Sequence, residues 1–386
     1  MAMGWSIVAS KRVVIVYKTL PHYRVDFYNL LRERLGRAGV VLDLVVGQPD
    51  SLMGQRNDTA VVDWALQIRN RYISLGKRQV VWQPCIGHVR KADLVIVEQA
   101  SRLLVNYPLH VARRLGGPKL GLWGHGVNLD STARSRVGEF AKRLLVKRAD
   151  WWFCYTEGTK RIVVNSGFSA RRATVVQNAI DTTSLQRARA EVAPEAQQEL
   201  RRRLGIGSGP VCLWLSSIYP TKRPEFMVAA FQEIRRLVPD AELLVVGDGP
   251  LRRVFDGAAE TQPGVHVVGA LFGKEMVEHA SLASVIVNPG LVGLTVLDAF
   301  ALELPMVTCA LDLHSPEVEY LVDGENGLIL PEDVLPADYG GAVAALLQDR
   351  QHLDKLRAGC RMGALRFTVE EMADRFAGGV LAALQS

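Results

Sequence analysis

The chain has few cysteines and no long apolar run, and both absences limit what it can be. Its five cysteines are widely spaced and form no CxxC pair, which argues against a disulfide framework and against a metal site. No run of about 20 apolar residues is present, so the sequence predicts no membrane-spanning helix. The N-terminus has too short an apolar stretch and too early a Lys-Arg pair for a signal peptide. We therefore expect buried thiols in a cytoplasmic protein.

Other absences narrow the class of protein further. The sequence has no internal repeats, no low-complexity tracts, no RNA-binding aromatic motif and no pattern of a DNA-reading helix, so we expect no nucleic-acid partner. What is present is a globular composition, with 48% hydrophobic and 22% charged residues. A length of 386 residues predicts two domains, each with its own core.

The charge is split between two halves of opposite sign. Residues 1–180 carry 28 Lys and Arg against 12 Asp and Glu, whereas residues 181–386 carry 18 against 28. This asymmetry suggests two modules with different tasks. A basic half suits an anionic membrane or an acidic substrate.

Apolar runs alternate with amphipathic segments in the first half, which predicts a parallel sheet with helices on both faces. Tyr23–Gly39 reads as a helix with one apolar face, and Arg134–Arg148 as a strongly basic amphipathic helix. The expected strands are Val13–Tyr17, Val40–Val46, Leu94–Val97, Leu120–Trp123 and Trp151–Tyr155.

The same alternation restarts in the second half. Pro224–Leu237 reads as a helix that a proline opens, and the polar run Gln186–Arg203 as a surface helix and linker. The expected strands are Val211–Ser216, Leu243–Val246, Val265–Val268, Val285–Val287 and Met306–Thr308. We place the domain boundary near Asn178–Asp181. Two doubly wound domains in tandem would put a ligand crevice at the carboxyl ends of their strands, between the domains.

The segment Ser284–Leu304 is the most informative stretch of the chain. It reads as a buried strand, a loop that contains Gly290 and Gly293, and a helix over Val296–Leu304. The start of a helix after such a loop offers unbonded N–H groups and the positive end of a dipole, which suit a phosphate. Asp298, in the first turn, is placed to accept hydrogen bonds from ligand hydroxyls. The same pattern also occurs in α/β domains without a ligand at this point.

Further candidate residues of the second half also follow strands. Lys222 lies between a strand and a helix, where its ammonium reaches either a phosphate or only solvent. The turn at Gly247 and Gly249 lacks the third glycine of a dinucleotide-binding fingerprint, so we read it as a tight turn near the crevice. The loop backbone within Val267–Glu275 can pair with the edge of a base, although no side chain there indicates it.

Two segments of the first half carry candidate polar side chains. His22, Tyr23 and Arg24 follow the first strand and precede a helix, and His125 stands between two glycines after another strand. An imidazole on such a loop can enter a cleft and act as a hydrogen-bond donor or an acid–base group. A turn histidine bonded to nearby backbone is the alternative.

These segments together resemble the donor-site signature of retaining glycosyltransferase family four, which has the GT-B fold of two Rossmann-like domains facing an interdomain cleft. That signature runs Glu, Gly, Phe, Gly, Leu, three variable positions and then Glu-Ala. Gly293 and Leu294 match it, and Asp298 stands where the second Glu is usual. Gly247–Arg252 and Asn178–Leu185 resemble further family segments. The PHYR and WGHG motifs of the first half resemble a bacterial subgroup that works on polysaccharides and glycolipids.

The resemblance implies transfer of a hexosyl group from a UDP-sugar, or alternatively a GDP-sugar, to a hydroxyl of a saccharide, glycolipid or small-molecule acceptor. It implies a cytoplasmic enzyme that needs neither a metal nor a cofactor. Residues 1–180 would form the acceptor domain and residues 181–367 the donor domain. Residues 368–386 would form a helix that packs back towards the first domain.

Roles follow for individual residues from the same resemblance. Lys222 would grip the donor diphosphate and, with His125 near the transferred sugar, form the catalytic set. His22, Tyr23 and Arg24 would contact the acceptor. The predicted donor-binding residues are Ser216, Ser217, Lys222, Gly249, Ala270, Leu271, Gly290, Gly293, Leu294, Thr295 and Asp298.

Two departures from the family pattern qualify these roles. Gly290 stands where the family has its first Glu, which helps to orient the donor sugar, and Ser216-Ser217 replaces a Gly-Arg pair. An epimerase or phosphorylase on the same scaffold, and a nucleotide-sugar-binding protein without activity, are therefore alternatives. No carboxylate pair with glycosidase-like spacing stands out, which favours front-face transfer with retained configuration.

The basic helix Arg134–Arg148 permits two interpretations. Its cationic face suits peripheral contact with an anionic membrane near a lipid-linked acceptor, and it is also typical of a solvated surface helix, the interpretation that we favour.

Overall fold

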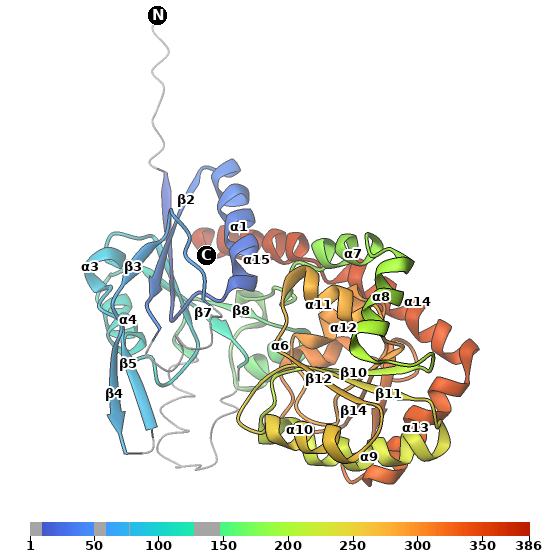
Figure 1. Cartoon of the computed structure of the whole chain (residues 1–386). Helices are drawn as coiled ribbons and strands as arrows, with labels where there is room; N and C mark the ends of the chain where they lie inside the picture. The colour runs from blue at the N-terminus through green and yellow to red at the C-terminus, as the bar shows by residue number, and fades with distance from the viewer. Residues whose placement is uncertain (1–9, 50–58, 77, 127–146) are drawn as a thin grey trace, which may run out of the picture. The chain divides into compact units, whose positions relative to one another are not determined.

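A computed structural model describes residues 10–49, 59–76, 78–126 and 147–386, and the chain divides into two compact units (Figure 1). Unit 1 contains Met1–Asn178 and Val369–Ser386, and unit 2 contains Ala179–Thr368. The division after Asn178 falls at the start of the range 178–181 that we expected for the domain boundary. The last helix of the chain belongs to unit 1.

Unit 1 is built on a parallel sheet in the strand order β3-β2-β1-β6-β7-β8-β9. Its central strands contain continuous apolar runs that are buried, Val13–Tyr17 in β1 and Leu94–Val97 in β6, because helices cover both faces of a parallel sheet. The predicted strands of this half are confirmed. The strands are β1 (Lys11–Tyr17), β2 (Val40–Gly47), β3 (Leu66–Ile68), β6 (Leu94–Glu98), β7 (Lys119–Gly124), β8 (Trp151–Cys154) and β9 (Ala173–Val175).

Helices lie on both faces of this sheet. On one face α15 packs against α1, β8 and β9, and its Phe376 stacks on Phe153 with ring centroids 4.3 Å apart. The core on the other face includes side chains of α3, α4 and α6. The helices are η1 (His22–Arg24), α1 (Val25–Arg37), α3 (Ile86–Val89), α4 (Asn106–Arg114), α6 (Glu157–Asn165), η2 (Ala170–Arg172) and α15 (Val369–Gln385).

A two-stranded antiparallel hairpin follows the edge strand β3 and was not expected from the sequence. It pairs β4 (Arg71–Leu75) with β5 (Arg78–Trp82), so that Arg71 lies opposite Trp82. Polar residues interrupt β4, and only Val80–Trp82 of β5 is continuously apolar, a shorter run than those of the central strands.

Unit 2 is built on a second parallel sheet, in the strand order β12-β11-β10-β13-β14-β15. All five strands predicted for this half are confirmed, and β15 is added at the edge. The strands are β10 (Val211–Leu215), β11 (Glu242–Val246), β12 (Val265–Gly269), β13 (Val285–Val287), β14 (Met306–Cys309) and β15 (Gly327–Leu330).

Two groups of helices enclose this sheet (Figure 1). Helices α9, α10 and α13 share one core with Trp214 of β10, whereas α7, α11, α12 and α14 contact one another on the other side. The helices are α7 (Thr182–Ala190), α8 (Pro194–Leu204), η3 (Pro220–Lys222), α9 (Pro224–Leu237), α10 (Arg252–Thr261), α11 (Gly273–Ala280), α12 (Thr295–Ala301), η4 (Pro316–Tyr320), α13 (Pro336–Gln348) and α14 (Arg350–Arg366).

Three predicted helices differ from the structure or lie outside it. The surface helix and linker expected over Gln186–Arg203 are parts of two helices, α7 and α8, because Pro194 opens α8 after a break at 191–193. The helix expected over Val296–Leu304 begins at Thr295 and ends at Ala301, and Glu303 has a left-handed φ of 53°. Most of the basic segment 134–148 lies outside the described residues. None of the described helices combines the length and the apolar character that a membrane crossing requires.

Candidate functional site

The candidate site lies at the carboxyl edge of the unit 2 sheet, where the loops after the parallel strands meet. Backbone hydrogen bonds join these loops to one another. The Gly247 N–H donates to Gly269 O at 2.8 Å, and the Ile218 N–H to Asp248 O at 2.9 Å. The Leu291 N–H donates to Thr221 O at 2.8 Å. The segments that were selected separately from the sequence therefore form one connected edge.

Three consecutive amides in the loop after β13 are tied to other parts of unit 2. The Gly290 N–H donates to Asn288 Oδ1 at 3.3 Å and the Leu291 N–H to Thr221 O at 2.8 Å. The Val292 N–H donates to His314 Nδ1 at 2.9 Å. These bonds attach the first half of the loop to β13, to η3 and to the segment after β14.

The next three amides, of Gly293, Leu294 and Thr295, have no acceptor among the described residues. Successive unbonded N–H groups at the end of a loop form an anion-binding concavity. The helix that follows, α12, has 7 residues rather than the nine of the predicted segment, so its dipole contributes less than the sequence suggested. The amides themselves are the main positive feature of this loop.

Gly290 lies against the main chain of η3, and this contact leaves no room for a side chain. A Cβ atom at this position would lie 2.3 Å from Lys222 Cα. An acidic side chain here would push η3 away from the loop. Glycine at this position, where the family pattern has Glu, permits the two segments to pack this closely.

Lys222 ends η3 beside this loop. Its ammonium donates to Leu291 O, and no described carboxylate forms an ion pair with it. Burial lowers the pKa of this ammonium from 10.5 to about 8. The positive charge is thus partly desolvated and lacks an acidic partner, which is the state of a group placed to meet an anion.

Asp298 lies in the first turn of α12, as the sequence predicted. No described side chain donates a hydrogen bond to its carboxylate. Burial raises the pKa of Asp298 from 3.8 to about 7. Opposite pKa shifts of an acid and a base near one set of loops are a recognised mark of a functional site.

The turns after β10 and β11 hold three further predicted residues. Ser216 is half-buried and Ser217 exposed, and the Trp214 indole donates to Ser216 O at 3.0 Å. Gly249 approaches the neighbouring turn so closely that a Cβ atom would lie 2.5 Å from Ile218 O. A side chain at this position would separate the two turns.

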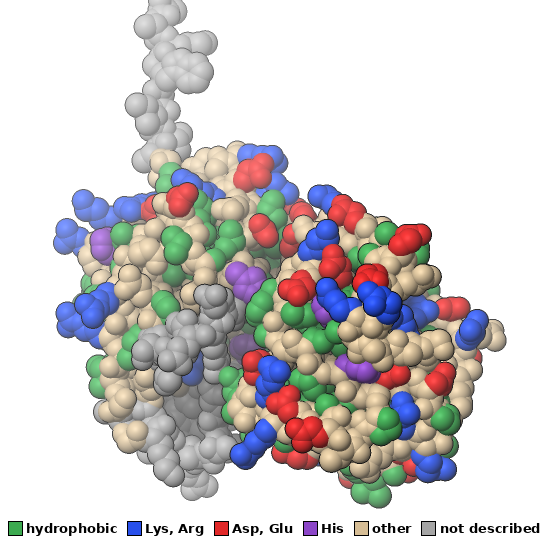
Figure 2. Space-filling view, viewed as in Figure 1, with side chains coloured by type: hydrophobic (Ala, Val, Ile, Leu, Met, Phe, Trp, Pro, Cys, Tyr) green, Lys and Arg blue, Asp and Glu red, His purple; other side chains and the backbone are tan. Residues whose placement is uncertain are grey.

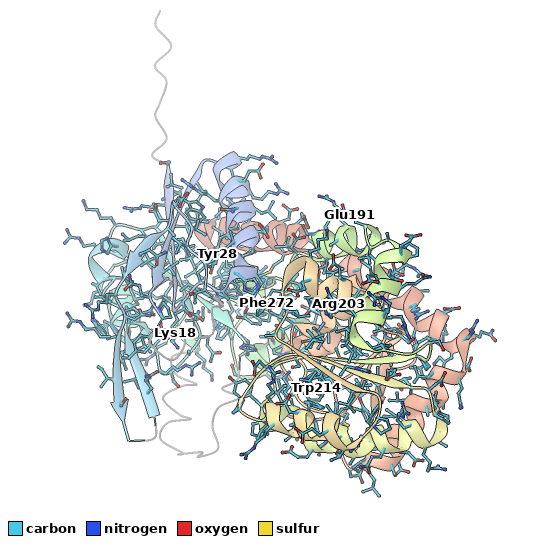
Figure 3. The ribbon with its side chains drawn as sticks, viewed as in Figure 1. Lys18, Tyr28, Glu191, Arg203, Trp214 and Phe272 are labelled. Atoms are coloured by element: carbon cyan, nitrogen blue, oxygen red, sulfur yellow. The ribbon has the colours of Figure 1, made fainter. Side chains whose placement is uncertain are left out.

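The loop after β12 contains Ala270, which is exposed, and Leu271, which is half-buried. The next residue, Phe272, exposes 62% of its surface and is labelled in Figure 3. Phe272 was not selected as a candidate from the sequence. Only the structure shows that its ring lies outside the core, next to the backbone that we expected to bind a base.

His314 was also missed. Its ring stands between the loop after β13 and the end of β14, bonded to Val292 and to Cys309. The available sequence signal was a histidine five residues after a buried strand end, without the flanking glycines that selected His125.

The predicted residues of unit 1 fall into different environments. His22 is exposed and Tyr23 half-buried, with ring centroids 5.8 Å apart. Arg24 is 2% exposed, donates to Asn178 Oδ1, and lies 5.4 Å from the centroid of the Trp123 ring. The Arg24 side chain therefore belongs to the interior of unit 1.

His125 follows the end of β7 in unit 1. Its ring is half-buried and its centroid lies 4.4 Å from that of Tyr155. Gly126 has a left-handed φ of 74°, a turn conformation that glycine adopts without strain.

A cavity of about 510 Å³ lies elsewhere in unit 1, lined by Arg69, Asn70, Arg71 and Pro84. These residues surround the start of the hairpin that was not predicted. Neither Arg69 nor Arg71 forms an ion pair with a described acid.

Residues 209–349, wholly within unit 2, match the family described as "Glycosyl transferases group 1". The match includes Lys222, the loop after β13 and Asp298. Within the described residues, no three His, Cys, Asp or Glu side chains group closely enough to hold a metal ion.

Curated relatives match part of the chain. A GDP-mannose-dependent alpha-(1-6)-phosphatidylinositol monomannoside mannosyltransferase of Mycolicibacterium smegmatis is 31% identical over 150 residues, which is 36% of this chain and 38% of the relative. An alpha-D-kanosaminyltransferase of Streptomyces kanamyceticus is 25% identical over 187 residues, 47% of each chain. The match thus spans less than half the length of these relatives.

A solved structure covers nearly the whole chain. Anabaena HepE in complex with UDP superimposes with a TM-score of 0.70 at 14% identity, over 96% of this chain and 99% of HepE. The chain has the GT-B fold. The two Rossmann-like units expected from the sequence are confirmed by this likeness in fold.

Proposed function

We propose that the protein is a retaining glycosyltransferase that moves a hexosyl group from a nucleotide-diphosphate sugar to an acceptor hydroxyl. The observation that carries this proposal is the row of three unbonded amides at Gly293, Leu294 and Thr295 beside the desolvated ammonium of Lys222. The match of residues 209–349 to a glycosyltransferase family supports it independently.

The proposed chemistry uses these groups to receive negative charge. As the bond between the anomeric carbon and the diphosphate oxygen breaks, the oxygen keeps the electron pair and the sugar ring becomes positive. The acceptor oxygen attacks the same face of the anomeric carbon, and its proton passes to the departing phosphate. Lys222 and the three amides are held in place before the reaction, so they stabilise the leaving group without reorganisation. We propose no metal and no cofactor in this scheme.

The proposed nucleotide contacts lie on the same edge. The carboxylate of Asp298 accepts from ribose hydroxyls, Ser216, Ser217 and Gly249 line the diphosphate, and the backbone at Ala270 and Leu271 holds the base. Stacking of a base on exposed Phe272 would add about 1–3 kcal/mol. One relative is named for GDP-mannose and one neighbouring structure contains UDP, so experiment must decide which nucleotide the donor carries. We favour UDP.

We propose that unit 1 supplies the acceptor contacts. His22 and Tyr23 are reachable from solvent, whereas buried Arg24 acts by holding this segment in place. The cavity beside Arg69 and Arg71 suits an acceptor that carries a phosphate or a carboxylate. His125 would act on the transferred sugar.

We propose a bacterial, cytoplasmic enzyme, peripheral to the membrane when its acceptor is a lipid. All five cysteines are buried free thiols, which suits a reducing compartment.

The test is incubation of the purified protein with UDP-sugars and GDP-sugars in the absence of acceptor. Slow release of free sugar, together with a raised melting temperature for one nucleotide series, supports the proposal. Conversion of the donor to an epimer would indicate an epimerase, and phosphate-dependent cleavage would indicate a phosphorylase. Binding without any turnover would indicate a sugar-nucleotide-binding protein.

Two further measurements test the finer parts of the proposal. The anomeric configuration of the product, read from its NMR coupling constant, should equal that of the donor. Turnover should be unchanged by a chelator such as EDTA. An inverted product, or loss of turnover on chelation that a divalent ion restores, would contradict the corresponding part.

A further inference from the structure

A histidine behind the donor loop holds the residue that precedes the three unbonded amides. His314 lies in the segment between β14 and η4, and its ring is half-buried. The Val292 N–H donates to His314 Nδ1 at 2.9 Å, and His314 Nε2 lies 2.7 Å from Cys309 O. The imidazole therefore bridges the loop after β13 and the end of β14.

These two partners determine the protonation state of the ring. An amide N–H can only donate, so Nδ1 carries no proton and accepts; a carbonyl oxygen can only accept, so Nε2 carries the proton and donates. The ring is the neutral Nε2–H tautomer. Burial lowers the pKa of His314, and the nearby ammonium of Lys222 lowers it further, while the bond to Cys309 O opposes this. Protonation at Nδ1 would break the bond to Val292.

A second bond from the same segment fixes the other side of Val292. The Ser315 N–H donates to Val292 O at 2.9 Å, so both the N–H and the carbonyl of Val292 are held by His314 and Ser315. The next residue, Gly293, has Ser315 Oγ only 3.2 Å from the position that a Cβ would occupy. Val292 is thus the last anchored residue before the row of amides begins.

We propose that His314 is a positioning residue for the donor phosphates, whose neutral imidazole fixes Val292 so that the amides of Gly293, Leu294 and Thr295 point at the leaving diphosphate. This inference rests on the proposed function and deepens it. His314 itself touches neither sugar nor phosphate. Its effect is to keep three main-chain N–H donors in position before the nucleotide binds. A flexible loop would lose conformational entropy on each binding event to reach the same arrangement.

Three substitutions separate the two bonds of the ring. His314→Asn keeps an acceptor near the place of Nδ1, His314→Gln keeps a donor near the place of Nε2, and His314→Leu removes both at similar volume. We expect the Leu and Gln variants to raise the KM for the nucleotide sugar about tenfold, because the Val292 N–H loses its acceptor. The Asn variant should restore most of the loss.

Hydrogen exchange gives a readout that does not depend on turnover. In the wild type the Val292 amide should exchange slowly with or without UDP, and in the Leu and Gln variants it should exchange fast. The Asn variant should again resemble the wild type. Equal exchange in all four proteins would overturn the proposal.

A matched control is His266, whose Nε2 lies 2.9 Å from Glu242 Oε2 at the starts of β12 and β11, the opposite edge of the same sheet. His266→Leu should lower the melting temperature without changing the KM for the donor. If His314→Leu and His266→Leu have the same effect on KM, or if Asn fails to rescue where Gln succeeds, His314 has no positioning role.

Failure of the proposed function would look different. A wild-type protein that neither binds nor cleaves any nucleotide sugar would reject the proposed function. A wild type that cleaves the donor, with a His314→Leu variant of unchanged KM and unchanged Val292 exchange, would reject only the inference about His314.

Discussion

The two units share an architecture and differ in how they present polar groups at the carboxyl ends of their strands. In unit 2 the edge offers main-chain amides, one desolvated ammonium and one desolvated carboxylate. In unit 1 the most strongly basic of the predicted residues, Arg24, is inside the core, and the described cavity lies near the hairpin. Unit 2 also contains the whole of the family match.

Their charges differ as well. Unit 1 carries 29 Lys and Arg against 15 Asp and Glu, and unit 2 carries 17 against 25. Figure 2 shows Lys and Arg groups over the part of unit 1 near α3 and β3, and mixed charges over unit 2. The proposed site for an anionic nucleotide diphosphate therefore lies in the unit with the negative net charge. Binding there is possible because main-chain amides and the Lys222 ammonium supply positive groups next to the phosphates. Local donors, rather than net charge, decide where an anion binds.

The largest effect expected in unit 2 follows from removal of its ammonium. Lys222→Ala should reduce turnover by about 100-fold or more, because one preorganised group that stabilises the leaving charge is lost. The melting temperature should change little, since loss of the hydrogen bond to Leu291 O is offset by removal of a desolvated charge. Lys274→Ala, at an exposed lysine of α11, is the control and should leave turnover unchanged. Full activity of Lys222→Ala would remove the phosphate role from this residue.

The close contact between η3 and the loop after β13 is tested by a single methyl group. Gly290→Ala places a Cβ about 2.3 Å from Lys222 Cα, so η3 must move, and we expect both a lower melting temperature and a loss of turnover of more than tenfold. Gly257→Ala, in α10, meets no atom within 4 Å and should be neutral or stabilising by up to about 1 kcal/mol. Equal behaviour of the two alanine variants would contradict the packing described for η3.

The corresponding test in unit 1 uses His125. His125→Ala should lower kcat about tenfold or more, within the range of general acid–base catalysis, while the affinity for the donor nucleotide stays the same. That split would separate a unit 1 role in the reaction from the unit 2 role in donor binding. His88→Ala, at an exposed histidine of α3, serves as control. Unchanged kcat and KM in His125→Ala would show that His125 takes no part in the reaction.

The raised pKa of Asp298 predicts a pH dependence in the stability of unit 2. Because Asp298 binds its proton more tightly in the folded state, its contribution to the free energy of unfolding is complete below about pH 4 and is lost as the pH rises to about 7. Asp298→Asn should therefore be more stable than the wild type at pH 8, by on the order of 2 kcal/mol, but not at pH 4. Denaturant titrations at both pH values measure this, with exposed Asp338→Asn as control.

Nucleotide binding should show the opposite trend with pH. Only the ionised carboxylate is a full acceptor for ribose hydroxyls, so UDP affinity should fall as the pH drops through about 7. A stability or affinity profile in Asp298→Asn that is identical to the wild type would show that Asp298 does not titrate as described.

The smallest expected effect concerns the cavity of unit 1. Neutralising both guanidinium groups in Arg69→Gln/Arg71→Gln should lower kcat/KM a few-fold for an acceptor with a phosphate or carboxylate, and not for a neutral one. Arg90→Gln/Arg114→Gln removes the same charge at exposed positions that do not line the cavity and is the matched control. An equal loss in both double variants would assign the effect to net charge.

The sequence predicted the strands of both sheets well because parallel strands are continuous buried runs such as Val13–Tyr17, which few other structures produce. It also predicted α9 at its observed bounds, since Pro224 marks the first helical position and an apolar face continues to Leu237. The hairpin β4–β5 has no such run, and the break between α7 and α8 depends on one proline within a polar segment.

Local sequence pattern was sufficient to select the candidate site residues but not to predict the contacts between them. Gly293, Lys222 and Asp298 follow strands and are typical of a ligand edge, so local pattern was sufficient to select them. The contact of Gly290 with Lys222 and the bond of His314 to Val292 join residues that are far apart in the sequence. The pattern of a single sequence does not predict such tertiary contacts. Main-chain N–H donors are also not recognisable from the sequence, because nearly every residue type has one.

The central claim is that main-chain amides after β13 receive the charge of a departing nucleotide. A crystal structure of the protein with bound UDP, or with GDP if that nucleotide binds, tests this most directly. We predict the distal phosphate within hydrogen-bond distance of the N–H groups of Gly293, Leu294 and Thr295, with the Lys222 ammonium at the same phosphate. A nucleotide bound elsewhere, with these three amides still bonded to no ligand atom, would contradict the account.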